Sequence, residues 1–243
     1  ASTVEELQPM QGSKYLQSDS SAALRETLRG GDNKMITGTP CQIASVRKFL
    51  RLRNREDDFL LVDLFCHGVP SQLLWQKYRE MNAAVFENAD RVIFRDKSFG
   101  WHGSLAVSAF KSRQKIYSSR FADGDLFYRF YLGNSVLSLP CYTCPFRLAH
   151  SAADIRLGDM WGKKYTADES GVSAILTFTE RGKQAVESLK HIVHHPESIC
   201  DATAGQMSRD LKVRPARRKI LNAHGGRMSV KKIYGFYIVP HRL

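Results

Sequence analysis

Residues 34–65 predict a strand, a helix and a second strand in immediate succession. Residues 34–37 indicate a short buried strand, and residues 59–65 form a nearly continuous apolar run, which is typical of a parallel sheet covered on both faces. The intervening residues 42–52 place four apolar side chains on one helical face: Ile43, Val46, Phe49 and Leu50. Because a helix that links two parallel strands is typical of α/β proteins, this unit indicates the fold class.

The rest of the chain alternates between further helices and strands. Ser71 is expected to cap a helix, and short alternating runs in the middle third suit an antiparallel or mixed segment. Further helices are expected over residues 22–28 (ended by Gly30 and Gly31), 125–132 and 180–191, and further strands over residues 91–95, 104–110, 115–118, 154–157 and 172–178. The predicted fold is therefore α/β, with a mixed, partly parallel sheet flanked by helices.

Size and composition fit a compact protein. The 243 residues are 43% apolar and include 8 prolines, which allows a sizeable core. No apolar run approaches the roughly 20 residues that cross a bilayer, and no basic leader precedes an apolar core at the amino end. Neither a membrane span nor a signal peptide is expected. An odd number of cysteines without a secretion signal favours a reducing compartment, and hence the cytoplasm.

The formal net charge of +12 raises the question of nucleic acid binding. Basic residues cluster within residues 47–55 and 212–232. Neither cluster is interleaved with aromatic residues as in an RNA-recognition sheet, and no helix-turn-helix pattern is present. Nucleic acid is therefore not favoured, and a basic face suits an acidic redox partner or an anionic cofactor equally well.

Four cysteines lie in turns, two of them directly after predicted strands. Cys41 and Cys66 follow the two parallel strands, whose carboxyl ends form the edge where open α/β sheets bind ligands. Cys141 and Cys144 form a Cys-x-x-Cys pair between Pro140 and Pro145. The alternative for Cys41 and Cys66 is that each is a small hydrophobic residue at a strand end.

Four thiolates are a metal-binding set, and either zinc or an iron-sulfur cluster accepts them. A structural zinc site more often has two Cys-x-x-Cys knuckles, whereas one knuckle with two single cysteines suits a cluster held between loops. The expected arrangement is an α/β fold with cysteine-bearing loops holding an iron-sulfur cluster. Cys200 lies apart from the other four and is left outside the site.

Six short blocks follow one another along the chain: GSKYLQS from Gly12, GTPCQIA from Gly38, DLFCHGVPS from Asp63, FRDK from Phe94 with Gly100 and Trp101, CYTCPF from Cys141, and DIRLGDMWG from Asp154. In this order they resemble the coenzyme F420 hydrogenase/dehydrogenase beta subunit family, and the resemblance runs from about Gly12 to Gly182.

The resemblance implies an oxidoreductase with a [4Fe-4S] cluster and FAD, and places the cluster on Cys41, Cys66, Cys141 and Cys144. The implied partners are an electron-donor or electron-acceptor protein, either ferredoxin-like or another subunit, in an assembly that can be oligomeric. The implied acceptor is a small molecule, with coenzyme F420 as a candidate substrate. Residues 1–210 are then one flavin and iron-sulfur oxidoreductase domain, and residues 211–243 a basic extension packing on it.

Local chemistry selects candidate flavin contacts within the matching blocks. Lys14 and Ser13 are candidates for the pyrophosphate, and Thr39 and Gln42 lie beside a helix amino end where amide groups face an anion. Lys97 is a candidate catalytic residue, because its charge would stabilise a reduced isoalloxazine ring; the alternative is a solvated lysine.

Four further residues have competing structural interpretations. His67 is a candidate donor to the cluster or flavin, or a structural histidine; Trp101 is a candidate stacking residue, or part of the core. Asn134 is expected to bond a ring edge or cap a turn. Asp159, in a glycine-flanked turn after a strand, is a candidate catalytic acid that orients the flavin or a cluster-bearing loop.

Two other functions remain open from the residues alone. One is a zinc-stabilised basic binding module, and the other is a non-catalytic assembly subunit of the same fold.

The histidines 191, 194 and 195 are spaced for one helical face, and a solvated helix end is favoured over a metal site there because no carboxylate or cysteine is close by.

Overall fold

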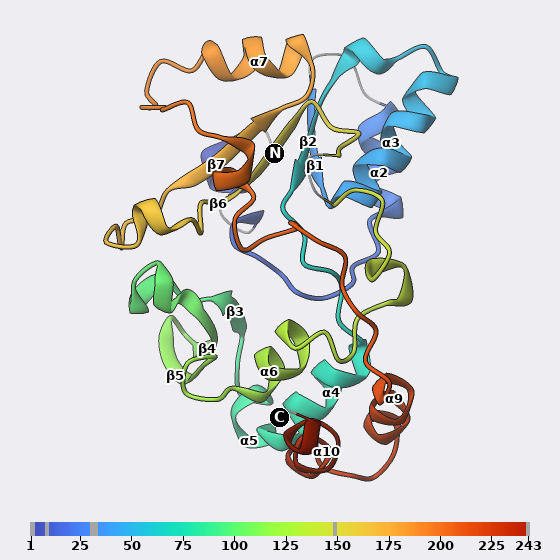
Figure 1. Cartoon of the computed structure of the whole chain (residues 1–243), viewed down its shortest axis with the longest axis vertical. Helices are drawn as coiled ribbons and strands as arrows, with labels where there is room; N and C mark the ends of the chain where they lie inside the picture. Colours follow the sequence, from blue (N-terminus) through green and yellow to red (C-terminus); the bar gives the residue numbers. More distant parts are fainter. Residues whose placement is uncertain (1–2, 8–9, 30–33, 148–149, 242–243) are drawn as a thin grey trace. The chain divides into compact units, whose positions relative to one another are not determined.

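The computed structural model describes residues 3–7, 10–29, 34–147 and 150–241. The chain forms two compact units (Figure 1): unit 1 comprises Ala1–Gln17, Gly68–Tyr142 and Leu211–Leu243, and unit 2 comprises Ser18–His67 and Thr143–Asp210. This grouping differs from the predicted division at residue 210, because residues 211–243 join the middle of the chain in unit 1. Among the described residues, every helix is too short or too polar to span a membrane.

Unit 2 contains a four-stranded sheet with the order β1-β2-β6-β7. The strands are β1 (Lys34–Gly38), β2 (Phe59–Leu64), β6 (Ile155–Asp159) and β7 (Ser173–Thr177). Strands β1, β2 and β6 are parallel, with Ile36 opposite Leu61, and β7 runs antiparallel to β6. The prediction of a mixed, partly parallel sheet is confirmed.

Helix α3 (Pro40–Leu52) is the crossover between β1 and β2. It begins two residues earlier than predicted, since proline is tolerated at the first helical position, where its missing N–H is not needed. The helix buries three side chains, Ile43, Val46 and Leu50, in a core that it shares with Ile36, Phe59, Leu61 and Ala153. The apolar spacing therefore predicts three of the four buried side chains correctly, whereas Phe49 is 40% exposed.

The other helices of unit 2 are α2 (Ser21–Arg29), α7 (Glu180–Glu187) and α8 (Ile199–Ala202). The predicted end of α2 at Gly30 and Gly31 lies outside the described residues. Helix α7 ends four residues before the predicted end at residue 191. The interpretation of the three histidines 191, 194 and 195 as one helical face is wrong, because all three are exposed in the irregular segment that follows.

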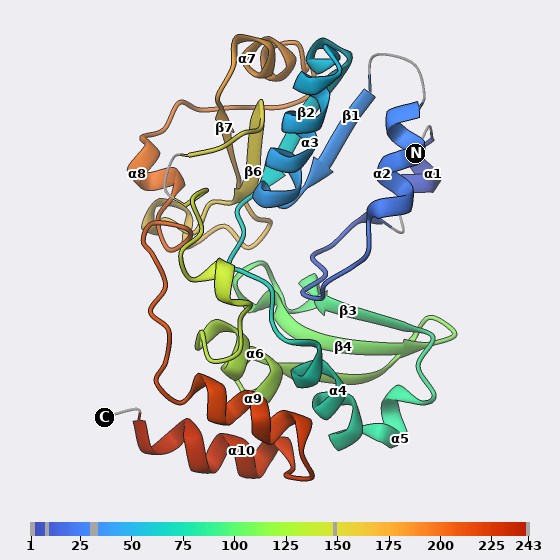
Figure 2. The same ribbon diagram turned by 90° about the vertical axis from the view of Figure 1, so that its right-hand side faces the viewer.

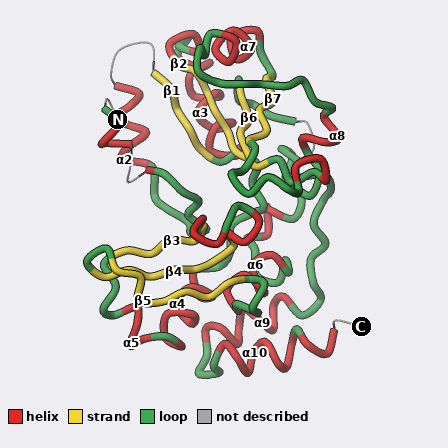
Figure 3. The backbone as a smooth tube through the Cα atoms, turned by 90° about the vertical axis from the view of Figure 1, so that its left-hand side faces the viewer, coloured by secondary structure: helices red, strands yellow, loops and turns green. Residues whose placement is uncertain are grey.

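Unit 1 contains an antiparallel sheet of β3 (Arg91–Arg95), β4 (Leu105–Lys111) and β5 (Gln114–Arg120), in that order (Figure 3). The turn between β4 and β5 uses Ser112 and Arg113, both with positive φ, at 48° and 70°. All three strands match the predicted runs to within two residues, because glycines and polar turns bound each run in the sequence.

The helices of unit 1 are α1 (Val4–Leu7), α4 (Gln72–Met81), α5 (Ala83–Phe86), α6 (Leu126–Leu132), α9 (Arg217–Gly225) and α10 (Val230–Tyr237). Figure 2 shows α9 and α10 side by side, and both contact α4. Ile220 of α9 and Ile233 of α10 are fully buried in one core with Tyr78, Phe127 and Phe130. The last helices therefore belong to the core of unit 1.

Candidate functional site

The parallel strands β1, β2 and β6 end at one edge of the unit 2 sheet. Cys41 follows β1, Cys66 follows β2, and Asp159 is the last residue of β6. The predicted placement of Cys41 and Cys66 after adjacent parallel strands is confirmed. This carboxyl edge is where open α/β sheets bind ligands.

Thr39 and Gln42 build the turn that presents Cys41. The side chain of Gln42 accepts hydrogen bonds at Oε1 from the Thr39 backbone N–H and from Thr39 Oγ1, both at 3.0 Å. Thr39 Oγ1 also lies 3.3 Å from Cys41 Sγ, and the thiol is exposed. Both residues therefore cap α3, and their predicted contact with a flavin stays a prediction.

The segment after β2 is held by Met207 and Arg147, two residues that the sequence pattern does not single out. The backbone N–H of Cys66 points at Met207 Sδ, 3.0 Å away, and Met207 is buried. Arg147 donates from Nη2 to the carbonyl of His67 at 3.0 Å. Since Arg147 lies three residues after Cys144, it connects the Cys144 segment to the Cys66 segment.

A buried ion pair lies on the strands below this edge. Arg156 of β6 donates from Nε and Nη2 to the Asp63 carboxylate of β2, at 2.6 and 2.7 Å, and both side chains are fully buried. The same guanidinium donates to the carbonyls of Phe146, at 3.2 Å, and His150, at 3.0 Å. It therefore binds the backbone of two residues that follow Cys144. Opposite charges within two apolar strands are the sequence signal that points to this pair.

Asp154 anchors β6 at its other end. Burial alone would raise the pKa of Asp154, but the Leu61 N–H, Arg47 and Thr179 outweigh burial and lower the pKa below its usual value. The Leu61 N–H and Arg47 donate at 2.8 Å, and Thr179 Oγ1 at 2.9 Å. The carboxylate therefore stays ionised, and its hydrogen bonds stabilise the sheet.

Asp159 is half-buried at the end of β6. Its carbonyl accepts a hydrogen bond from Gln206 Nε2 at 2.5 Å, one residue before Met207. The segment around residues 206–207 thus reaches the strand ends of both β2 and β6. The catalytic assignment of Asp159 stays a prediction.

Cys141 belongs to unit 1, where the backbone of residues 68–69 lies close to its side chain. The Val69 N–H donates to Cys141 Sγ at 3.5 Å. Gly68 has φ +136°, and a Cβ at this position would lie 3.1 Å from Cys141 Cβ. Only glycine allows the backbone to approach this closely in this conformation.

Two candidate flavin contacts of unit 1 lie near the amino end. Lys14 turns back on its own loop, and Nζ donates to the carbonyls of Met10, Gln11 and Gly12 at 3.3, 2.9 and 3.2 Å. Ser13 is exposed beside it. The three carbonyl contacts satisfy the ammonium group locally, which makes a loop-stabilising role evident.

The other unit 1 candidates differ in burial. Lys97 is exposed at the start of a short 3₁₀ turn, Lys97–Phe99. Trp101 is only 2% exposed, which fits core packing. Asn134 has a φ of 55°, and its buried Oδ1 has no hydrogen-bond partner among the described residues. Asn134 is therefore the candidate whose side chain has a buried acceptor to offer.

The four candidate metal ligands are divided between the units, with Cys141 in unit 1 and the other three in unit 2. Each carries a thiol rather than a disulfide. Within the described ranges, no three histidine, cysteine, aspartate or glutamate side chains are grouped so as to hold a metal ion. The four-cysteine site stays a prediction.

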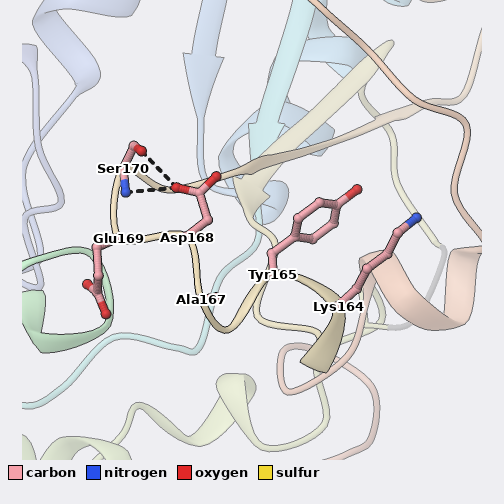
Figure 4. A pocket seen from close by; sticks show the side chains of 6 residues that line it. All are labelled: Lys164, Tyr165, Ala167, Asp168, Glu169 and Ser170. Atoms are coloured by element: carbon pink, nitrogen blue, oxygen red, sulfur yellow. Dashed lines mark hydrogen bonds between the residues drawn. The ribbon is translucent and has the colours of Figure 1, made fainter.

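The loop after β6 lines an open pocket of about 430 Å³ (Figure 4). Asp168 accepts hydrogen bonds from the backbone N–H and Oγ of Ser170, at 2.9 and 2.7 Å. Lys164 pairs with Glu197, which also accepts from Tyr165 Oη at 2.7 Å. These contacts are local to the loop and Glu197, so they define the shape of the loop and suggest no particular ligand.

The fold and the strand-end cysteines define an α/β protein with thiols at the ligand-binding edge of its sheet. Comparison with known families identifies the group. The chain belongs to the family described as the C terminus of the beta subunit of coenzyme F420 hydrogenase/dehydrogenase, which matches residues 31–194. The resemblance seen in the sequence is thereby confirmed.

A solved structure shares the fold. A chain of the F420-reducing [NiFe] hydrogenase complex from Methanosarcina barkeri superimposes with a TM-score of 0.51 at 19% sequence identity. The match covers 77% of this chain and 59% of that one, so this chain spans less than two thirds of its structural relative. No curated protein sequence matches this chain.

Proposed function

We propose that this chain is an oxidoreductase subunit that binds a [4Fe-4S] cluster and FAD. The observation that carries the proposal is the family match over residues 31–194, because that family is defined by coenzyme F420 hydrogenases and dehydrogenases. The six sequence blocks include all four cysteines assigned to the cluster.

The chemistry around one of the four cysteines fits a cluster. Val69 N–H donates to Cys141 Sγ at 3.5 Å. A donor of this kind stabilises negative charge on sulfur, and such donors are one of the means by which proteins tune cluster potentials. Cys41, Cys66, Cys141 and Cys144 would be the ligands.

Asn134 fits the edge of a flavin ring. Its buried Oδ1 lacks a hydrogen-bond partner within the described part of the chain, and a buried acceptor without a partner is costly. An N–H group of an isoalloxazine ring would satisfy it. Ser13, Lys14, Thr39, Gln42, His67 and Trp101 complete the proposed contacts.

When bound, FAD would exchange hydride equivalents while the cluster carries single electrons. The chain's own part is to hold and orient. The Asp63–Arg156 pair and Arg147 keep the Cys66 and Cys144 segments in place. Lys97 would supply positive charge beside a reduced ring, and Asp159 would orient a ligand at the end of β6.

The proposed acceptor is a small molecule, with coenzyme F420 as the first candidate. The structural relative is part of an F420-reducing hydrogenase complex, which supports another subunit as redox partner. A ferredoxin-like protein is the other candidate partner. We propose that the assembly is oligomeric and cytoplasmic.

The proposal is tested by replacing each cysteine with serine in the full chain and reconstituting anaerobically with iron and sulfide. Each of Cys41→Ser, Cys66→Ser, Cys141→Ser and Cys144→Ser should lower bound iron to less than about half of the wild-type amount, because a cluster requires four ligands. Cys200→Ser is the matched control, since Cys200 is an exposed thiol outside the site, and it should leave iron unchanged.

Other results would point to the alternatives. Stoichiometric zinc with no iron would favour the zinc-stabilised binding module. A folded protein that takes up neither metal nor flavin would favour an assembly subunit without redox chemistry. Equal iron in all five variants would contradict the ligand assignment.

A further inference from the structure

Two arginines of the carboxyl-terminal segment, residues 211–243, donate hydrogen bonds to one loop of unit 1. Arg214 donates from Nε to the carbonyl of Gly133 at 2.7 Å. Arg217, the first residue of α9, donates from Nε and Nη2 to the carbonyl of Leu137, at 3.0 and 2.7 Å. Both acceptors lie in the connection that follows α6 and contains Cys141, residues 133–142, here called the Cys141 loop.

The Cys141 loop is closed on itself by Tyr142, which is 1% exposed. Tyr142 Oη donates to the carbonyl of Asn134 at 2.8 Å and accepts from the Leu137 N–H at 3.3 Å. The Arg217 guanidinium carbon lies 5.6 Å from the centre of the Tyr142 ring, within the range of a cation–π contact. Arg217 therefore contacts both the middle and the end of the loop.

The same loop pairs with the segment that contacts the Cys141 sulfur. Ser138 N–H donates to the Val69 carbonyl and Ser71 N–H to the Val136 carbonyl, both at 2.9 Å, on either side of a bridge between Pro70 and Leu137. This short antiparallel pairing fixes Val69, whose N–H donates to Cys141 Sγ. The Leu137 carbonyl that Arg217 binds thus lies at the centre of the arrangement.

We propose that Arg214 and Arg217 are positioning residues that fix the Cys141 loop and so hold the Cys141 sulfur against the Val69 N–H. Arginine suits the task because two N–H groups of its planar fork can converge on one carbonyl oxygen while the guanidinium packs on an aromatic ring. That Cys141 is a cluster ligand rests on the proposed function, whereas the position of its thiol does not.

This assignment divides the basic residues of the segment into two groups. Arg214 and Arg217 are half-buried against the loop. The remaining described lysines and arginines of the segment are exposed: Lys212, Arg218, Lys219, Arg227, Lys231 and Lys232. The two arginines therefore have a structural partner that the net charge of the segment does not reveal.

The test compares Arg217→Ala with Arg218→Ala in the full chain without metal. Arg218 is the next residue of α9 and is exposed, which makes its replacement a matched control. The rate of Cys141 alkylation by iodoacetamide is read peptide by peptide with mass spectrometry. Arg217→Ala should speed it about tenfold, as expected from the loss of hydrogen bonds to a charged donor, and Arg218→Ala should leave it unchanged. The exposed thiols Cys41 and Cys200 serve as internal references.

A second variant separates positioning from general loss of stability. Ile220→Val removes one buried methyl group from the same helix without touching either arginine. Its Cys141 alkylation rate should stay at the wild-type level, and Arg217→Lys should fall between wild type and Arg217→Ala, because lysine provides a donor without the planar fork.

Hydrogen exchange gives an independent readout of the loop. In Arg217→Ala, the amides of Leu137 and Ser138 and of Val69 and Ser71 should exchange faster, and those of β4 should not. Equal Cys141 alkylation in Arg217→Ala and Arg218→Ala would overturn the inference, as would an equal increase in Ile220→Val. Failure of the proposed function would show differently, as a wild-type chain that binds no iron.

Discussion

Arg156 connects several separate stretches of unit 2. Its guanidinium pairs with Asp63, donates to two carbonyls of the Cys144 segment, and lies between the rings of Phe65 and Phe178, 5.7 and 5.6 Å from their centres. A buried charge is costly unless it is paired and hydrogen-bonded, and here each polar group of the pair has partners. The pair therefore fixes the loop geometry as well as the sheet.

We expect Arg156→Met to destabilise the protein by about 3–5 kcal/mol, because the Asp63 carboxylate would stay buried without its counterion. The double variant Asp63→Leu with Arg156→Met should recover part of that loss, since no charge is then left buried. Urea unfolding of the three proteins measures both effects. A double variant less stable than Arg156→Met alone would contradict this account.

Asp96 gives unit 1 a pH dependence in acid. Burial alone would raise the pKa of Asp96, but the bonds from Lys115, Ser108 and the Ser98 N–H outweigh burial and lower the pKa to about 2. The Lys115 Nζ and Ser108 Oγ lie 2.6 Å from the carboxylate. Since the folded pKa is below the unfolded value of 3.8, this stabilisation is complete above that value and is lost as the pH falls toward 2.

The Asp96 contribution should amount to about 2 kcal/mol near neutral pH. Asp96→Asn should remove that part of the acid dependence between pH 4 and pH 2, measured as the urea midpoint against pH. Asp210→Asn is the control, because Asp210 is an exposed carboxylate. Wild type and Asp96→Asn losing stability equally over this range would show that Asp96 is not responsible.

At the scale of elements, the sequence predicts the strands and helix caps that depend on local residue patterns. Strands β1 to β7 appear where alternation or apolar runs place them, and Ser71 caps α4 by accepting from the Leu73 N–H at 3.2 Å. Helix α7 ends at Glu187, earlier than predicted. The apolar residues that follow, Leu189, Ile192 and Val193, are exposed, so no packing partner within the described residues stabilises a longer helix. Spacing predicts a helix, but tertiary packing decides its length.

The carboxyl-terminal helices show the same limit. The sequence predicts a basic extension that packs on the same domain but not which of its side chains are buried: α10 buries Ile233 completely in the unit 1 core and leaves Phe236 65% exposed. Ile233→Ala should therefore cost about 2–5 kcal/mol. The matched control in the same helix, Phe236→Ala, should cost far less, because little of that ring is buried.

Hydrogen exchange locates the effect of Ile233→Ala. Because Ile233 shares its core with Phe94 of β3 and Val107 of β4, faster exchange should extend to the amides of β3, β4 and β5. Faster exchange confined to residues 211–243 would mean that the two terminal helices are an independent appendage.

At the scale of the whole molecule, each unit is assembled from separate stretches of chain. Local periodicity carries no information about which stretches combine, so the division into units could not be predicted from the sequence. The candidate site shows the same limit. The turns that carry Cys41 and Cys66 were predictable from strand ends, but Arg147, Met207, Arg214 and Arg217 were not, since each acts on a residue far away in the sequence.

The proposed cofactors of this family member are a [4Fe-4S] cluster and FAD. The most direct test is an anaerobic absorption spectrum of the purified full chain, with iron, acid-labile sulfide, zinc and flavin quantified in the same sample. The account predicts flavin bands over a broad iron-sulfur absorption, with about four iron and four sulfide per chain and about one FAD. A colourless protein with stoichiometric zinc and no flavin would contradict it.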